Sequence, residues 1–276
     1  MPGKLSVASW NVKNFHRKST SKTDVRNHIK SMGPNGSGPD IFALLEVKGR
    51  DVWRSLYKEF PKHNFFITEG KQSQQILIAA RKTLRHFITQ RDDFKSGRTT
   101  LRPGPFLVVE VAPGDYYSLL FLHLKSFRTP VDLGLRDDQV EHAFHLRSAI
   151  DKAHQAAGGE GRAKFLFMGD INTQGMQYWQ STKISWDVEV NKLEERSREY
   201  DMTLAKKDYE STWTDGRGKF SDLDHVIASD TVNLQAWDGS NVQVLGWNKH
   251  PIGSQEFKNF VDKISDHCAI YCEILY

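Results

Sequence analysis

Asparagine, glutamate, histidine and aspartate recur in this chain at the ends of apolar segments that predict β-strands. The sites lie after or beside the predicted strands Leu5–Ser9, Ile41–Leu45, Tyr116–Leu122, Lys164–Met168, Leu223–Ala228 and Ala269–Leu275, and they are Asn11, Glu46, His123, Asp170, Asn172, Asp224, Asp266 and His267. Carboxylate and amide oxygens bind hard divalent cations, and histidine and aspartate transfer protons. Each site alone has an ordinary structural interpretation, such as an Asx turn in Gly169-Asp-Ile-Asn172. Their recurrence at strand ends indicates metal-assisted acid–base chemistry.

The elements that must position these residues alternate between strands and helices. Helical spacing is predicted for Asp24–Met32, for a segment near Asp51–Phe60 and for Asp137–Ala156. Further strands are predicted at Asn64–Thr68, Gln75–Ala80, Val232–Trp237 and Asn241–Leu245, and Phe106–Ala112 and Tyr116–Leu122 form a hairpin. Residues 175–220 are polar and predicted to be irregular. No linker or repeat divides the chain, so we expect one α/β domain over residues 1–276 with mixed sheets.

Composition excludes several classes of protein. The chain has 276 residues, 38% of them hydrophobic, which is enough for a sizeable core and too much for a disordered chain. There is no apolar run long enough to cross a membrane, and the first residues lack the apolar region of a signal peptide. The only cysteines, Cys268 and Cys272, are predicted to be free thiols, which favours a cytoplasmic location.

The net charge of +4 is divided unevenly along the chain. Residues 1–138 carry 23 Lys and Arg against 13 Asp and Glu, whereas residues 139–276 carry 15 against 21. A basic half beside an acidic half suits an enzyme that binds a polyanion near a cation-binding carboxylate cluster, although chance distribution of surface charge remains an equal alternative.

Six short motifs together resemble the endonuclease/exonuclease/phosphatase superfamily, the DNase-I-like fold. They are Ser9-Trp-Asn-Val12, Leu44-Leu-Glu46, His123-Leu-Lys-Ser126, Gly169-Asp-Ile-Asn172, Leu223-Asp-His-Val226 and Ser265-Asp-His267. The resemblance spans the chain from Ser9 to Ile270. It implies a four-layer α/β sandwich in which two mixed β-sheets pack face to face with helices outside. It also implies hydrolysis of phosphoesters by an activated water, without a covalent enzyme intermediate.

The resemblance assigns expected roles to the motif residues. Glu46 matches the principal metal carboxylate of the family, and Asn11 and Asp266 would complete a Mg²⁺ site, at which Mn²⁺ should substitute. His267 would contact the scissile phosphate or act as general base, with Asp224 fixing its tautomer. Asp170 would orient or deprotonate the attacking water, Asn172 would hold that water or a phosphate oxygen, and His123 would bind phosphate or protonate the leaving group.

The substrate is expected to be nucleic acid, most plausibly DNA, with no membrane and no obligate protein partner. Phosphate contacts are expected from a set of basic and polar residues, namely Lys48, Arg98, Arg102, Lys125, Ser126, Arg128 and Arg136, and base stacking from Trp213, with Trp179 and Trp186 nearby. The alternative that these tryptophans anchor loops is slightly favoured over base stacking. His123-Leu-Lys-Ser126 looks more like DNase-I-type bacterial nucleases than AP endonucleases. The alternatives are an inositol-phosphate phosphatase or sphingomyelinase of the same fold, and a non-catalytic nucleic-acid-binding member.

Overall fold

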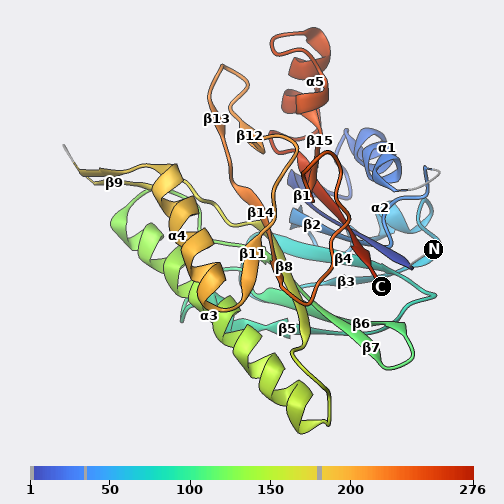
Figure 1. The fold of residues 1–276 in the computed structure, drawn as a ribbon. Helices are drawn as coiled ribbons and strands as arrows, with labels where there is room; N and C mark the ends of the chain where they lie inside the picture. The colour runs from blue at the N-terminus through green and yellow to red at the C-terminus, as the bar shows by residue number, and fades with distance from the viewer. Residues whose placement is uncertain (1–2, 34–35, 179–181) are drawn as a thin grey trace. The chain divides into compact units, whose positions relative to one another are not determined.

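The computed structural model describes residues 3–33, 36–178 and 182–276. Its internal contacts divide the chain into two compact units. Unit 1 comprises Met1–Leu84, Lys206–Ser221 and Leu234–Tyr276, and unit 2 comprises Arg85–Ala205 and Asp222–Asn233. Each unit is built around one six-stranded mixed sheet. Figure 1 shows the elements in chain order.

The sheet of unit 1 has the strand order β15-β16-β1-β2-β4-β3. The strands are β15 (Gln243–Leu245), β16 (Ala269–Leu275), β1 (Lys4–His16), β2 (Ile41–Lys48), β4 (Gln75–Arg81) and β3 (His63–Ile67). β1 and β2 are parallel, and the other neighbours are antiparallel. The runs 41–45 of β2 and 76–80 of β4 are entirely apolar, and residues on both faces of these strands are buried.

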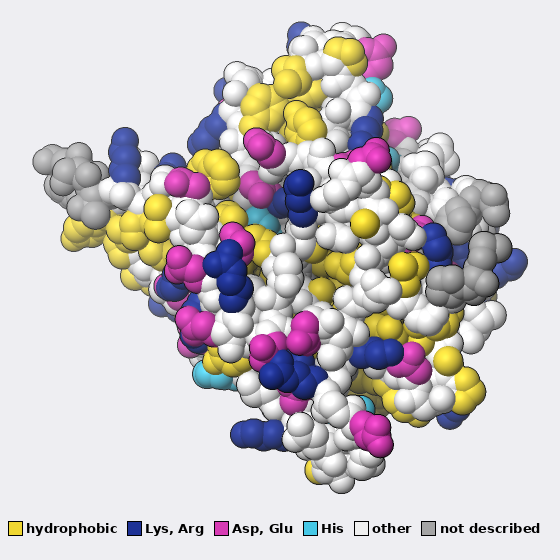
Figure 2. Space-filling view, in the orientation of Figure 1, with side chains coloured by type: hydrophobic (Ala, Val, Ile, Leu, Met, Phe, Trp, Pro, Cys, Tyr) yellow, Lys and Arg dark blue, Asp and Glu magenta, His cyan; other side chains and the backbone are white. Residues whose placement is uncertain are grey.

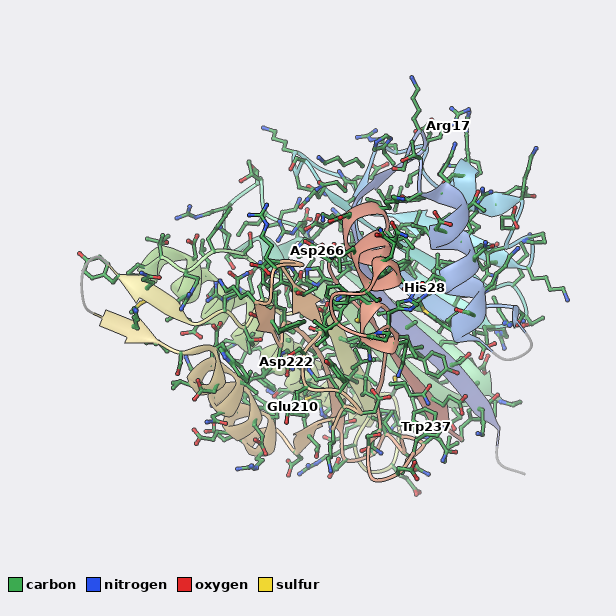
Figure 3. All side chains as sticks on the ribbon, turned by 90° about the horizontal axis from the view of Figure 1, so that it is seen from above. Arg17, His28, Glu210, Asp222, Trp237 and Asp266 are labelled. Carbon is green, nitrogen blue, oxygen red and sulfur yellow. The ribbon has the colours of Figure 1, made fainter. Side chains whose placement is uncertain are left out.

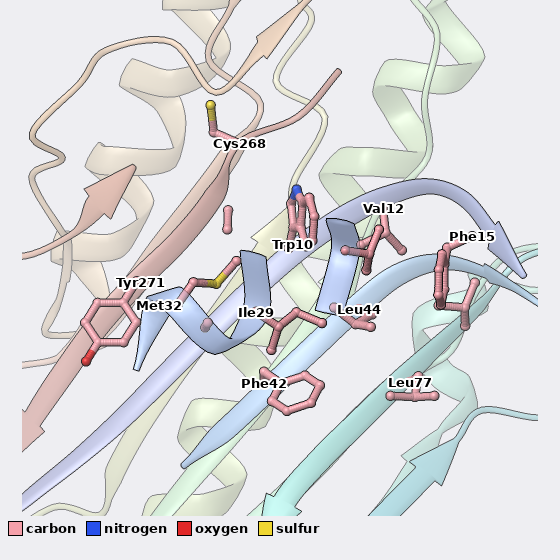
Figure 4. Packing of buried hydrophobic residues seen from close by; sticks show 14 of the residues in the cluster. Trp10, Val12, Phe15, Ile29, Met32, Phe42, Leu44, Leu77, Cys268 and Tyr271 are labelled. Carbon is pink, nitrogen blue, oxygen red and sulfur yellow. The ribbon is translucent and has the colours of Figure 1, made fainter. Parts of the chain in front are cut away.

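Helices cover one face of this sheet. α1 (Lys22–Met32) places Val25, Ile29 and Met32 against Trp10, Phe42 and Leu44 of the sheet in one hydrophobic cluster, part of which Figure 4 shows. The short α2 (Arg54–Tyr57), the 3₁₀ turn η3 (Trp247–Lys249) and α5 (Gln255–Lys263) contribute Leu56, Trp247, Phe257 and Phe260 to the same cluster. A small hairpin of β12 (Trp213–Thr214) and β13 (Phe220–Ser221) completes unit 1.

The sheet of unit 2 has the order β11-β14-β8-β7-β6-β5. The strands are β11 (Met202–Leu204), β14 (Asp224–Ser229), β8 (Lys164–Asp170), β7 (Asp115–His123), β6 (Gly104–Ala112) and β5 (Arg85–Arg91). The 3₁₀ turn η2 (Asp92–Lys95) follows β5, and the short strands β9 (Met176–Tyr178) and β10 (Thr182–Ile184) pair with each other. α3 (Pro130–Ala156) and α4 (Trp186–Glu199) lie side by side and share a hydrophobic cluster with β7, β8 and β14 (Figure 1).

The predicted fold class is confirmed as a DNase-I-like α/β fold with two mixed sheets and associated helices. Three local predictions are wrong. Residues 175–220, predicted to be irregular, contain α4. The sequence did not reveal this helix because its buried residues are Glu189, Leu193 and Ser197, which form no apolar repeat. The long helix begins at Pro130 and not at Asp137. Thr129 and Asp132 form a capping box at this earlier start. Val232–Trp237 forms only isolated bridges, because Leu234 contacts Ile274 at a single position.

Within the described ranges, none of the helices has the length and apolar character needed to span a bilayer. Cys268 and Cys272 are both free and buried, as predicted. Trp179 lies outside the described residues. Over α4, basic and acidic side chains are interspersed on the surface in Figure 2, in agreement with the ion pairs of this helix.

Candidate active site

Glu46 lies at an irregularity in two strand pairings of unit 1. The register of β2 shifts beside it both against β1 and against β4. Its φ is 58°, a left-handed conformation that costs a non-glycine residue about 1 kcal/mol or more. A bulge of this kind re-aims a side chain out of the strand pattern, and strained residues of this kind concentrate at functional sites. The backbone therefore supports a special role for the Glu46 carboxylate.

Asn11 and His267 lie beside Glu46 and form with it the unit-1 cluster, which also includes Asp266. The Asn11 amide nitrogen donates to Glu46 Oε1 at 3.2 Å and lies 3.5 Å from His267 Nε2. Its oxygen accepts from the backbone N–H of Lys13 at 3.1 Å. Asn11 thus orients Glu46 through its nitrogen, whereas the predicted metal ligand would be its oxygen.

Ser265 connects two members of this cluster by hydrogen bonds to their backbones. Its hydroxyl donates to the carbonyl of Asn11 at 2.6 Å and accepts from the backbone N–H of His267 at 3.0 Å. Ser265 is fully buried, so these bonds are shielded from water. The serine of the Ser265-Asp-His267 motif therefore ties β1 to the segment that carries the histidine, a positioning role that sequence reasoning did not assign although the motif contained it.

Three indole N–H groups hold the Asp266–His267 segment, which follows α5 (Figure 3). Trp10 donates to the His267 carbonyl at 3.0 Å and Trp247 to the Asp266 carbonyl at 3.0 Å. Trp213 donates to Asp266 Oδ2 at 3.3 Å. This bond makes Trp213 an anchor of the aspartate, and the stacking of bases on its half-buried ring stays a prediction.

The donors of the unit-1 cluster fit a hard divalent cation. Glu46 and Asp266 offer carboxylate oxygens, the ligand type that Mg²⁺ takes, whereas Asn11 would have to turn its amide to offer its oxygen beside Glu46. Lys13 lies 3.7 Å from Asp266 Oδ2 and offsets part of the negative charge. The strained, bulge-borne carboxylate at Glu46 is the observation that favours a metal here over a simple structural pair.

In unit 2, three predicted residues lie in one row across three adjacent strands. His123 of β7 is opposite Asp170 of β8, and Asp170 is opposite Asp224 of β14. All three side chains are buried. Residues directly opposite each other in a sheet point to the same face, so the strand register brings the row together. His123 Nε2 lies 3.5 Å from Asp170 Oδ2. These residues and Asn172 form the unit-2 cluster.

The Gly169-Asp-Ile-Asn172 motif is shaped by close backbone contacts. Gly169 has a φ of 140°, and a Cβ there would lie 2.0 Å from the Leu122 carbonyl oxygen. The backbone N–H of Asn172 donates to Asp170 Oδ1 at 3.1 Å, so the Asx turn is present together with the candidate site. The Asn172 amide donates to the Leu124 carbonyl at 3.2 Å and its oxygen accepts from Gln174. Both polar atoms of its side chain thus hold the loop, which favours a positioning role.

The prediction that Arg136 binds phosphate is corrected by the burial of its side chain. It is 1% exposed and forms a two-pronged ion pair with the buried Glu189 at 2.6 and 3.0 Å. It also donates to the carbonyls of Phe127 and Gly175, and the Gly175 N–H donates to Glu189 at 2.7 Å. Burial inside unit 2 excludes contact with a substrate phosphate. The pair instead connects the loops that follow β7 and β8.

Two further basic residues, Arg102 and Lys125, contact the protein itself. Arg102 is half-buried and donates from Nε to the His123 carbonyl at 2.9 Å and from Nη2 to the Leu124 carbonyl, so it supports the end of β7. Lys125 pairs with Asp132 at 2.8 Å. Burial opposes ionisation of Asp132, but the hydrogen bonds from Lys125 and Thr129 hold its pKa below the ordinary value.

The remaining residues predicted to contact phosphate differ in how far their side chains are exposed to solvent. Ser126 and Arg128 are half-buried, and the Arg128 carbonyl accepts from the N–H of Gln177 in β9 at 2.7 Å. Lys48, at the end of β2, and Arg98 are exposed to solvent. Of the predicted set, Lys48 and Arg98 are therefore the cations whose side chains reach solvent most freely.

Two mixed sheets of this topology, with carboxylate, amide and histidine side chains at the ends of their strands, define a DNase-I-like protein. The chain belongs to the Endonuclease/Exonuclease/phosphatase family, whose sequence model matches residues 8–267. Members of this family are generally phosphoester hydrolases that depend on divalent metal ions.

Solved structures with this fold include distant relatives. A truncated TDP2 from Caenorhabditis elegans is 18% identical, with 99% of this chain and 98% of that chain covered and a TM-score of 0.62. TDP2 from D. rerio in complex with a single-strand DNA product is 17% identical, with 99% of both chains covered and a TM-score of 0.64. A family protein from Bacteroides thetaiotaomicron is 16% identical, with 100% and 99% covered and a TM-score of 0.58. No curated protein matches the chain significantly.

Proposed function

We propose that this protein is a Mg²⁺-dependent phosphodiesterase, and specifically an endonuclease that hydrolyses DNA. The observation that carries the proposal is the buried row of His123, Asp170 and Asp224 across three neighbouring strands. A buried histidine 3.5 Å from a buried carboxylate supports a role for this pair in proton transfer, directly or through one water. Membership of the family supports the hydrolase chemistry, and the single-strand DNA bound to D. rerio TDP2 supports nucleic acid as the substrate class.

The unit-1 cluster is proposed to hold the metal through Glu46, with Asp266 and Asn11 completing the site. When bound, Mg²⁺ supplies positive charge to the phosphate oxygens on which negative charge accumulates. Asn11 orients Glu46, and Ser265 and the three tryptophan indoles fix the segment that carries Asp266 and His267. Mn²⁺ is expected to substitute.

The unit-2 cluster is proposed to manage the attacking water. Asp170 orients the water or accepts its proton, and His123 transfers a proton or binds phosphate beside it. His267 is proposed to contact the scissile phosphate or serve as base, and Asp224 to stabilise a histidine in its required tautomer. Because one family model spans residues 8–267, we propose that both units form a single catalytic domain.

The test is nicking of supercoiled plasmid by the full chain with Mg²⁺, with Mn²⁺ and with EDTA. We expect EDTA to abolish nicking, and Asp170→Asn and His267→Ala to lower its rate by about 10²–10⁴. Glu195→Gln, a change at an exposed carboxylate of α4, is the matched control and should keep the wild-type rate. Cleavage that survives EDTA, or a near-normal rate in both active-site variants, would contradict the proposal.

A phosphoesterase acting on a lipid or inositol phosphate is the second candidate. It is favoured by exposed apolar side chains at Phe127, Tyr178 and Trp186, of which Phe127 is 67% exposed. The hydrogen bond between Gln177 and the Arg128 carbonyl places β9 beside the segment after His123. Metal-dependent turnover of sphingomyelin vesicles or inositol polyphosphates, with plasmid left intact, would select this candidate.

A further inference from the structure

A groove of about 300 Å³ lies along the edge of the unit-1 sheet, outside both clusters. β3 is the last strand of that sheet, and the groove is formed by β3 together with residues of and around α2. Its lining is mainly aromatic and apolar, with Trp53, Tyr57, Phe65, Phe66, Ile67 and Lys82 as the main contributors. Nothing in the proposed chemistry uses this groove.

Cationic side chains lie beside the aromatic rings of the groove. Trp53 and Tyr57 meet edge to face with ring centres 6.2 Å apart. The Arg54 guanidinium lies 5.6 Å from the centre of the Trp53 ring, and Lys82 Nζ lies 5.8 Å from that of Tyr57. Tyr57 is 48% exposed, so one of its faces is open to a ligand. Rings beside cations are the surface on which unpaired bases stack while their phosphates are neutralised.

The charge around the groove is positive. Arg54, Lys58, Lys62 and Lys82 are exposed, and the charge of Arg54 also acts on the neighbouring carboxylate Asp51. The nearby carboxylates Asp51 and Glu59 pair instead with Arg17 and with Arg26 and Lys30. Hydrogen bonds from those cations keep the pKa of Asp51 and Glu59 low, so both pairs stay ionised at neutral pH.

The end of the groove at Ile67 lies near the part of the unit-1 sheet in which Glu46 is found. Ile67 at the end of β3 is opposite Leu77 of β4, and Leu77 is opposite Leu44 of β2, two residues before Glu46. Neighbouring strands are about 4.8 Å apart, so β3 lies about 10 Å from β2. A chain held at Glu46 needs to extend by only one or two nucleotides to enter the groove.

We propose that this groove is an accessory binding site for the unpaired tail of a single-stranded nucleic acid. Its bases stack on Tyr57 and Trp53, and its phosphates contact Arg54, Lys82 and the lysines that follow α2. The choice of nucleic acid rests on the proposed function, but binding here needs neither the metal nor hydrolysis. An extended peptide pairing with the open edge of β3 would use backbone groups instead, and it would not need the exposed cations.

The test is fluorescence anisotropy of a labelled oligothymidylate of about 12 nucleotides with the full chain in EDTA. Tyr57→Ala and Lys82→Glu change exposed side chains and should each weaken binding about tenfold, the first by loss of a stacking surface and the second by reversal of a charge beside the phosphates. Lys82→Glu should also flatten the salt dependence of binding. The matched controls are Tyr116→Ala, whose tyrosine is 53% exposed in unit 2, and Lys152→Glu on α3, which should bind like the wild type.

Two further measurements separate this inference from the proposed function. Photocrosslinking of an oligonucleotide containing 5-iodouracil should label Tyr57 or Trp53, and hydrolysis of a dinucleotide should be unchanged in Tyr57→Ala. Weaker binding by the groove variants in a protein that cleaves no phosphodiester would uphold the groove and refute the nuclease. Wild-type binding by both groove variants, equal losses in the controls, or capture of an extended peptide in place of DNA would overturn the inference.

Discussion

At the scale of single residues, the strand register brings His123, Asp170 and Asp224 together in unit 2, and hydrogen bonds bring Asn11, Glu46 and His267 together in unit 1, whereas the chemical roles of these residues stay predictions. Glu46, His123, Asp170 and His267 could be proposed as site residues from side-chain type and position alone. The roles of Asn172, Arg136 and Trp213 could not, because they depend on partners distant in sequence. Arg136 is buried against Glu189, 53 residues away, and nothing local distinguishes it from an exposed arginine.

The left-handed backbone of Glu46 makes a stability prediction. Glycine adopts this conformation without strain, whereas alanine keeps the strain and loses the carboxylate. We therefore expect Glu46→Gly to be more stable than Glu46→Ala by about 1 kcal/mol in urea unfolding, with both variants inactive. Equal stability of the two variants would show that the backbone at residue 46 relaxes when the side chain is lost.

His28 predicts a dependence of stability on pH. Its ring lies 4.7 Å from Trp10 and 5.1 Å from Phe260, and its position on α1 is labelled in Figure 3. Burial lowers its pKa from 6.5 to about 4, with repulsion from His250 adding to the effect and the bond to the Leu245 carbonyl opposing it. The unfolded chain therefore binds a proton that the folded chain does not as pH falls from about 6.5 to about 4, and stability is lost across that window.

Replacing His28 should remove this contribution. In His28→Gln the amide can still donate to the Leu245 carbonyl, so we expect a shallower fall in the free energy of unfolding between pH 6.5 and 4. His145→Gln, at an exposed position of α3, is the control. Urea unfolding at several pH values makes the measurement, and identical pH slopes for His28→Gln and the wild type would contradict it.

At the scale of elements, strands with strong apolar runs were predictable and the polar helix α4 was not. β16 has the predicted bounds, Ala269–Leu275, because its residues are almost all apolar. α4 buries Glu189 and Ser197 on its inner face, so its burial periodicity is invisible in hydropathy. A buried glutamate requires a buried cation, and that pairing belongs to the tertiary structure rather than to the local sequence.

The Arg136–Glu189 pair should therefore dominate the stability of the α3–α4 contact. Removing one partner leaves a buried charge, so we expect Glu189→Ala to destabilise the protein by about 3–5 kcal/mol. The control is Asp137→Asn, which breaks an exposed ion pair with Lys192 between the same helices and should cost about 0–1 kcal/mol. Chemical denaturation makes the comparison, and similar losses in both variants would refute the importance of burial.

At the scale of the whole molecule, the chain consists of two units, each with its own sheet and hydrophobic cluster. The sequence predicted one domain because no linker interrupts it. The division into two units depends on contacts between segments far apart in the chain, and composition does not reveal such contacts. Unit 1 alone draws on three separate segments. Cooperative unfolding is the physical meaning of a single domain, and it can be measured directly.

Cys272 of unit 1 provides the probe. Burial raises the pKa of its thiol to about 12, so alkylation requires unfolding of the unit around it. If the units form one cooperative domain, alkylation in urea should follow the same transition as the loss of far-ultraviolet circular dichroism. An alkylation midpoint clearly separate from the circular dichroism midpoint would show that the units unfold independently.

The most direct test of the central claim is a single-turnover reaction of the full chain with a DNA oligonucleotide and Mg²⁺ in ¹⁸O-labelled water. If water activated by the protein attacks phosphorus directly, as proposed, mass spectrometry should find one ¹⁸O atom in each new phosphate, and Asp170→Asn should form product about 10²–10⁴ times more slowly. Product phosphates without the label, or DNA left intact by a folded protein with metal present, would contradict the account.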